Sequence, residues 1–169
     1  ASQNGRIEVV KLLLADSRVD PSACDNNSIR LACKNGHIEV VKLLLADSRV
    51  DPSAYFNDAV RLACENSHIE VVKLLLSDSR VDPGAYDNYA IRLACRNGHI
   101  EVVKLLLADC RVDPGAFDNY AIQWASDKGH TDVVKLLLAD SRVDPSAYSN
   151  YAIRLACKNG HIEVVKLLL

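Results

Sequence analysis

The stretch that decides the fold is Asn97–Leu107, which reads NGHIEVVKLLL. Its opening Asn-Gly pair ends one helix, because glycine adopts the left-handed backbone conformation at little cost. The residues that follow predict a second helix from about His99 to Ala108. In this helix Glu101, near the positive end of the helix dipole, pairs with Lys104 one turn later. The other side chains are almost all apolar, so this helix must be covered by protein on several sides.

The same stretch recurs at intervals of 31 residues along the whole chain. The glycine of this stretch recurs at the same place in every repeat except one, where Ser67 stands; we call this 31-residue spacing the lattice. The recurring glycines are Gly5, Gly36, Gly98, Gly129 and Gly160. Cutting the chain before each recurring proline gives four complete repeats and two partial ones: 21–51, 52–82, 83–113 and 114–144, flanked by 1–20 and 145–169. Residues 1–169 therefore form a single array without a linker. One repeat cannot bury its apolar helix alone, whereas stacked neighbours can, which predicts a solenoid.

Each repeat is expected to hold a short first helix before the apolar one. In the repeat 83–113 this helix is predicted over Asn88–Arg96, and Asp87 or Asn88 can cap its N-terminus with a side-chain oxygen. After the second helix, the segment Asp109–Gly115 is a return loop, stopped by Pro114.

These residues resemble a known family. Asn97–Leu107 is similar to the second-helix signature of ankyrin repeats, and Leu93-Ala94-Cys95 resembles the Leu-Ala-Ala of their first helix. The resemblance covers every repeat and implies an all-α, ankyrin-like helix–turn–helix solenoid of stacked 31-residue repeats. It also implies a scaffold for protein–protein interaction, with no catalytic residues and no cofactor to carry over.

The chain departs from the family pattern in two ways. Ankyrin repeats usually have about 33 residues, so these repeats are shorter, with the loss in the loop between stacked repeats. The family's Thr-Pro-Leu-His motif is replaced by Tyr89-Ala90-Ile91-Arg92. The β-turn finger of the family is therefore expected to be smaller or differently shaped.

Composition excludes several other classes of protein. Apolar residues make up 49% and charged residues 25% of the chain, as in folded soluble proteins. The net charge of −2 gives no field to gather nucleic acid or an anionic membrane. No run approaches the roughly 20 apolar residues of a spanning helix, and the start does not resemble a signal peptide. We expect the protein in the cytoplasm by default, with the nucleus as the alternative.

The recurring cysteines and histidines are interpreted as structural. Stacked helices lie roughly 8–10 Å apart, whereas a disulfide needs Cα atoms within about 7 Å, so the cysteine ladder is expected to be reduced and buried. One histidine per repeat cannot bring together the three or four ligands of zinc, so we expect the histidines to fasten the inter-helix turn and no metal site to form. No repeat adds a nucleophile beside a base, so the chain is not expected to be an enzyme. The cysteine ladder is Cys33, Cys64, Cys95 and Cys157, with Ser126 in the gap.

An arginine between two acids recurs in each return loop. Asp78-Ser79-Arg80-Val81-Asp82 is one example, and its copies place Arg18, Arg49, Arg111 and Arg142 in the same way. We interpret these groups as solvated or bridging ion pairs that set the register of one loop on the next.

A partner surface is predicted on one face of the first helices. Tyr89, Arg92, Leu93 and Arg96 stand at i, i+3, i+4 and i+7, so they share a face, which is expected to line the concave surface of the array. Ile91, Ala94 and Cys95 are expected to point the other way, into the stack. In the repeat 114–144 this face differs most. It reads Tyr120, Gln123, Trp124 and Asp127, followed by Lys128. Trp124 is either an anchor for a partner or a side chain that fills a packing gap.

The remaining candidates extend this face along the array. On the first helices they are Arg30, Lys34, Arg61, Glu65, Tyr151, Arg154 and Lys158. Near the proline turns they are Tyr86 and Phe117, in a row with Tyr55, Phe56 and Tyr148. Together they predict a groove of arginine and tyrosine side chains suited to an acidic or extended peptide.

Two function classes therefore remain open. The leading interpretation is a scaffold that binds a protein partner on its concave face. The alternative is a structural spacer or self-assembling array without a specific ligand, which the near-identity of the repeats favours. The partial repeats 1–20 and 145–169 have no polar capping repeat. We therefore expect a longer parent array, or end-to-end self-stacking of the uncapped ends if this segment exists alone.

Overall fold

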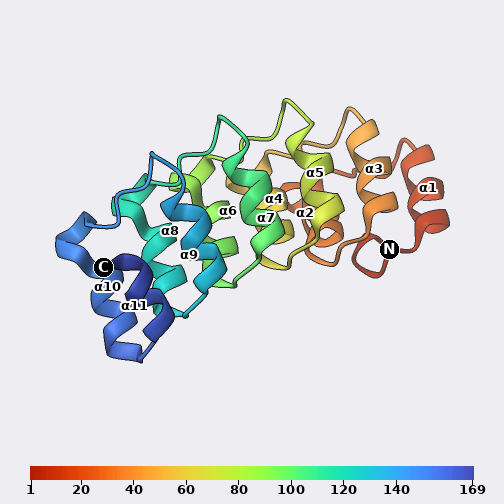
Figure 1. The fold of residues 1–169 in the computed structure, drawn as a ribbon. Coiled ribbons are helices and arrows are strands. Elements are labelled where there is room, and N and C mark those ends of the chain that lie inside the picture. Colours follow the sequence, from red (N-terminus) through yellow and green to blue (C-terminus); the bar gives the residue numbers. More distant parts are fainter. The chain divides into compact units, whose positions relative to one another are not determined.

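The computed structural model describes all residues 1–169 and contains helices but no strand, which confirms the all-α prediction (Figure 1). The chain forms two compact parts, Ala1–Pro83 and Gly84–Leu169, which we call the N-terminal and C-terminal halves. Short and long helices alternate in each half. No β-turn finger with strands is present, in agreement with the shortened loops.

In both halves the first helices pack side by side in one row and the second helices in another. The N-terminal half holds η1 (Ser2–Asn4), α1 (Ile7–Ala15), α2 (Ala23–Lys34), α3 (Ile38–Ala46), α4 (Ala54–Glu65) and α5 (Ile69–Leu76). In it, α2 packs on α4, while α3 packs on α1 and α5. The C-terminal half holds α6 (Ala85–Arg96), α7 (Ile100–Leu107), α8 (Ala116–Asp127), α9 (Thr131–Leu138), α10 (Ala147–Asn159) and α11 (Ile162–Leu168). Here α8 packs on α6 and α10, and α9 packs on α7 and α11.

The core lies between these two rows. In α7 the side chains of Val102, Val103 and Leu106 are completely buried, while Glu101 and Lys104 face solvent and form an ion pair at 2.7 Å. From α6, Ile91, Ala94 and Cys95 are completely buried. The face predicted to point into the stack is therefore confirmed, and the same positions form the core in neighbouring repeats.

Four of the recurring histidines, His37, His68, His130 and His161, each tie their repeat to the one before it. The Nε2 atom of His161 donates to the carbonyl oxygen of Asp127 at 2.9 Å, and His68 makes the same bond to Lys34 at 2.9 Å. The predicted fastening role is correct, but the fastened turn belongs to the preceding repeat. The histidine ring also lies against the glycine of that turn. A Cβ atom added at Gly129 would stand 2.5 Å from Nδ1 of His161.

We expect Gly129→Ala to destabilise the chain more than Gly160→Ala. Both glycines have a left-handed φ, 72° and 74°, so either alanine costs about 1 kcal/mol in backbone strain. Nothing lies within 4 Å of a Cβ at Gly160, whereas at Gly129 the ring of His161 must move. Losing its hydrogen bond should add about 1 kcal/mol. Urea denaturation of both variants measures the difference, and equal losses would show that the histidine contact contributes nothing.

The turn that leads into each first helix has an unexpected backbone. Tyr86, Asp87 and Asn88 have φ values of 56°, 53° and 57°, and the corresponding residues of the other repeats are also left-handed. The predicted N-terminal cap is therefore wrong, because neither Asp87 nor Asn88 caps α6 with its side chain. Oδ1 of Asn88 instead accepts a hydrogen bond from the backbone N–H of Asp113, at 2.7 Å. This bond to the next loop helps to offset the strain of left-handed non-glycine residues.

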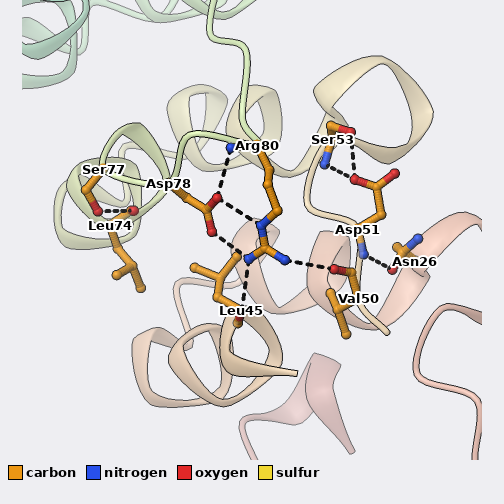
Figure 2. Close-up of polar contacts among 9 residues, drawn as sticks. All are labelled: Asn26, Leu45, Val50, Asp51, Ser53, Leu74, Ser77, Asp78 and Arg80. Atoms are coloured by element: carbon orange, nitrogen blue, oxygen red, sulfur yellow. Dashed lines mark hydrogen bonds and ion pairs between the residues drawn. The ribbon is translucent and has the colours of Figure 1, made fainter. Parts of the chain in front are cut away.

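Arginines of the return loops set the register of one loop on the next, as predicted, but through hydrogen bonds to backbone carbonyl oxygens, while their ion pairs stay within one loop (Figure 2). Arg80 forms an ion pair with Asp78 at 2.6 Å and donates to the carbonyl oxygens of Val50 at 3.2 Å and Leu45 at 2.9 Å. The acid that follows the arginine has a different role: in the neighbouring loop, Asp51 accepts two hydrogen bonds from Ser53. Arg49, Arg80 and Arg142 are each fixed by the preceding aspartate in this way and reach the repeat before.

These ion pairs predict a loss of stability in acid. Hydrogen bonds from the side chain and the backbone of Arg49 lower the pKa of Asp47 to about 2. Because the folded pKa lies below the ordinary value of about 4, this contribution to stability is complete above that pH. It is lost as the pH falls from about 4 to about 2. Urea denaturation at several pH values should show a smaller acid-induced loss for Asp47→Asn than for the unchanged chain, and parallel losses would contradict the assignment.

Candidate functional site

A cluster of aromatic and arginine side chains lies on the first helices of the C-terminal half. Four of its members come from the repeat 83–113 and three from the repeat 114–144. We call it the aromatic–arginine cluster; its members are Tyr86, Tyr89, Arg92, Arg96, Phe117, Tyr120 and Trp124. All seven were candidates from the sequence, and the fold brings them together because α6 and α8 pack side by side.

Trp124 lies at the centre of this cluster. Its ring meets Tyr120 of the same helix edge-on, with centroids 5.5 Å apart, and Tyr89 of α6 at 6.2 Å. The guanidinium of Arg96 lies 5.4 Å from the indole ring. Trp124 is half-buried. The indole therefore packs against its neighbours and also keeps a face open to solvent.

Arg92 is a buried cation inside the cluster. Only 6% of the residue is exposed, and its Cζ lies 4.8 Å from the ring of Tyr89 and 4.9 Å from that of Phe117. Its Nη2 donates to the carbonyl oxygen of Tyr86 at 3.0 Å, and its Nε has no hydrogen-bond partner. Burial lowers the pKa of this guanidinium, against a weaker opposing effect of Asp87. Arg92 is therefore an internal member of the cluster, in contact with Tyr86, Tyr89 and Phe117, and not an exposed cation.

Arg96 is the exposed cation of the cluster, and no carboxylate pairs with it. The nearby acid, Asp127, is held by other groups: Lys128 at 2.9 Å and the side-chain amide of Asn159 at 2.8 Å. The hydrogen bond from Lys128 lowers the pKa of Asp127. The guanidinium of Arg96 and the open face of Trp124 are thus exposed side by side, where a ligand can contact both.

Gln123 does not contribute a contact surface. It is 2% exposed, and its side-chain amide donates to the carbonyl oxygen of Asp118 at 2.6 Å. The glutamine thus bonds to the turn below it, much as Arg92 bonds to the carbonyl oxygen of Tyr86.

The N-terminal half uses a different arrangement at the same positions. Asp58 is buried between Arg30 and Arg61, and it accepts from each of them at 2.7 Å. Lys34 and Glu65, at the ends of α2 and α4, are exposed. Sequence reasoning missed Asp58, although the lattice gives a signal, since tyrosine holds this position in the three repeats that follow.

The candidates of the last repeat lie on α10. Arg154 and Lys158 are exposed, and the guanidinium of Arg154 lies 5.2 Å from the ring of Tyr151. Tyr151 in turn meets Tyr148 edge-on at 5.5 Å. These side chains are a smaller copy of the cluster on α6 and α8, without a tryptophan.

The row of second helices offers only shallow grooves. One of about 480 Å³ runs between α7 and α9, and another of about 480 Å³ lies between α3 and α5. Both are lined mainly by the recurring Ile, Glu, Lys and Leu positions. Because similar residues line the groove in different repeats, the groove does not distinguish one repeat from another as a binding site.

The cysteines and histidines do not gather into a site. All six cysteines are free, but the prediction that the ladder is buried is wrong at Cys157, which is exposed because α10 packs on only one other first helix, α8. Burial raises the pKa of Cys33, Cys64 and Cys95 well above the ordinary range. These thiols are therefore small, unreactive core residues. No group of three His, Cys, Asp or Glu side chains is placed to hold a metal ion. None of the helices combines the length and the apolar character that crossing a bilayer requires.

Comparison with known proteins points to one family. A family model described as ankyrin repeats, in three copies, matches residues 1–87 and 91–169. No curated protein matches the chain. The match covers both halves, in agreement with the repeated helix pairs of the structure.

Proposed function

The chain belongs to the ankyrin repeat family, whose repeats are generally protein–protein interaction modules and typically not enzymes, and from this premise we propose that it binds a protein partner through its aromatic–arginine cluster. The observation that carries the proposal is that the half-buried Trp124 lies beside the exposed Arg96, an arginine that no carboxylate of the chain neutralises. The cluster lies on the face of the first helices, which we propose is the concave binding face.

The chemistry of the cluster favours a protein ligand. Tryptophan, tyrosine and arginine dominate the energetics of protein interfaces, and here they already pack against one another without a partner. Tyr89 and Tyr120 hold the indole of Trp124 from two sides, and buried Arg92 fixes these rings from below. Little side-chain entropy is therefore lost on binding.

The partner proposed here presents an acidic residue beside an apolar one. A carboxylate can accept two hydrogen bonds from the guanidinium of Arg96, which lies over the ring of Trp124 and pairs with no carboxylate of the chain. An adjacent apolar side chain can cover the open face of Trp124. Arg154 and Lys158 are exposed on the same half and add positive charge for an acidic segment.

A self-assembling array is the second candidate, and one observation favours it. The second helices at both ends leave apolar side chains in solvent: Val9, Leu12 and Leu13 on α1, Ile162 on α11, and Leu169. Two copies of this segment could stack end to end through these faces. Sedimentation velocity of residues 1–169 and of Leu12→Glu decides this point. Concentration-dependent association that the substitution abolishes would support stacking, and a monomer at all concentrations would reject it.

Affinity capture from a lysate of the source cells tests binding by the cluster. The bait is compared with Arg96→Glu and with a matched control, Lys135→Glu, which reverses one exposed positive charge on α9 instead. Circular dichroism first establishes that all three baits keep their helices. The expected result is a protein captured by the unchanged chain and by Lys135→Glu but not by Arg96→Glu. Equal capture by all three would reject the cluster as the binding site.

A further inference from the structure

An arginine of one repeat repeatedly covers an aromatic ring of the next. The Cζ atom of Arg30 lies 4.4 Å from the ring centroid of Tyr55 in the N-terminal half. In the C-terminal half, Arg92 lies 4.9 Å from Phe117. Both pairs join the same two positions of the lattice, 25 residues apart. At these two positions the fold therefore places a guanidinium against the first residue of the left-handed turn in the next repeat, Tyr55 or Phe117.

Three groups hold the guanidinium of Arg92 in that place. They are the carbonyl oxygen of Tyr86, which accepts a hydrogen bond at 3.0 Å, and the rings of Tyr89 and Phe117. A planar guanidinium suits this set, because it donates in its plane and stacks on aromatic rings with its faces.

The next repeat has the same three groups but lacks the arginine. Phe117 stands in the place of Tyr86, Tyr120 in that of Tyr89, and Tyr148 in that of Phe117. Gln123 replaces the arginine, and its shorter side chain ends in a hydrogen bond to the carbonyl oxygen of Asp118. No guanidinium therefore reaches the carbonyl oxygen of Phe117 or the ring of Tyr148.

Without a guanidinium over it, the ring of Tyr148 is more exposed to solvent than the covered rings. It is 67% exposed, compared with 54% for Tyr55 and 53% for Phe117, the two rings covered by an arginine. No cation of the chain lies over its ring, since the nearest arginine of α10, Arg154, lies over Tyr151. Asp118 takes the place of Asp87, an acid whose charge favours the cationic form of Arg92.

We propose that the carbonyl oxygen of Phe117 and the rings of Tyr120 and Tyr148 form an open arginine site, which binds an arginine side chain of the protein partner. This inference rests on the proposed function and adds a second recognition point to it. The partner segment then carries an acidic residue for Arg96 and an arginine for the open arginine site. Arg92 fills the equivalent place in the preceding repeat, and Arg30 covers the matching ring in the N-terminal half while it pairs with Asp58, so the fold accommodates a guanidinium there.

A short peptide can probe this site without the partner. The probe is a blocked pentapeptide with one central arginine, and its control replaces the arginine by citrulline, a neutral side chain of nearly the same shape. The chain has six tyrosines, so aromatic NMR spectra of tyrosine-labelled protein resolve them, and Tyr148→Phe assigns the decisive signal. Three proteins are compared: the unchanged chain, Gln123→Arg, and Tyr55→Ala, which removes a ring already covered by Arg30.

We expect the arginine peptide to shift the signals of Tyr148 and Tyr120 saturably. Its affinity should be roughly fivefold higher than that of the citrulline peptide, the effect of one exposed cation–π contact. Gln123→Arg should abolish the shift, because the chain's own guanidinium then fills the site. Tyr55→Ala should leave the shift unchanged.

The absence of a saturable shift, equal binding of the citrulline peptide, or binding that survives Gln123→Arg would each overturn the open arginine site. These results leave the proposed function intact if Arg96→Glu still prevents capture of a partner. The reverse combination, a peptide shift without capture, would reject the proposed function and retain an arginine-binding surface.

Discussion

Leu106→Ala is expected to lower the free energy of unfolding by about 2–5 kcal/mol. The leucine lies on α7 with none of its surface exposed, and it belongs to the packed layer between the two rows of helices. Its loss leaves a cavity inside a repeat. Because repeat arrays gain stability from contacts between neighbours, a defect in an internal repeat also weakens the repeats beside it.

Leu12→Ala is the matched control for this experiment. Leu12 lies on α1, in the same recurring sequence, but is 74% exposed. Its substitution should change stability by less than about 0.5 kcal/mol. Urea denaturation followed by circular dichroism measures both variants. Similar losses for the two would mean that the rows of helices do not form the core described here.

Trp124→Leu should lower the affinity for the partner by about 2 kcal/mol, roughly thirtyfold. The substitution installs the residue that occupies this position in the neighbouring repeats, at Leu93 and Leu155, so the fold should persist. It removes the indole that lies between Tyr89, Tyr120 and Arg96. Isothermal titration with the captured partner measures the change.

Leu136→Ala supplies the control for binding. Leu136 lines the shallow groove between α7 and α9, on the row of second helices. Its substitution should leave the affinity unchanged, even if stability falls. A loss of affinity in Leu136→Ala with none in Trp124→Leu would move the binding site to the second helices and leave Trp124 with a packing role alone.

Much of the fold could be predicted from the sequence because its signals are local and repeated. The Asn-Gly pair and the apolar run after it predicted a second helix from about His99 to Ala108, and α7 spans Ile100–Leu107. Helical periodicity alone placed Ile91, Ala94 and Cys95 in the core. Repetition strengthened each of these inferences, since the same pattern had to satisfy the same packing several times.

The turn before each first helix could not be predicted, because its bonds are not local. Asp87 and Asn88 fit the pattern of a helix cap, but Asn88 binds the backbone of Asp113, 25 residues later. Three consecutive left-handed residues are also unusual for side chains other than glycine. Only the packed neighbour makes this conformation favourable, and a single repeat does not reveal that neighbour.

The sequence predicted which side chains share one face of the first helices, but not how deeply each of them is buried. The helical wheel places Tyr89, Arg92 and Arg96 on one face, as the structure has them. It does not show that aromatic rings of the following repeat cover Arg92 and leave Arg96 exposed. The burial of Gln123 follows from the same packing.

Hydroxyl-radical footprinting of the partner complex tests the central claim most directly. Aromatic side chains react readily with the radical, so the cluster reports its own accessibility. Binding through the first helices predicts that the partner protects Trp124, Tyr89 and Tyr120, while Ile100 and Leu136 in the groove of the second helices keep their reactivity. Protection of Ile100 and Leu136 with unchanged oxidation of Trp124 would contradict the account.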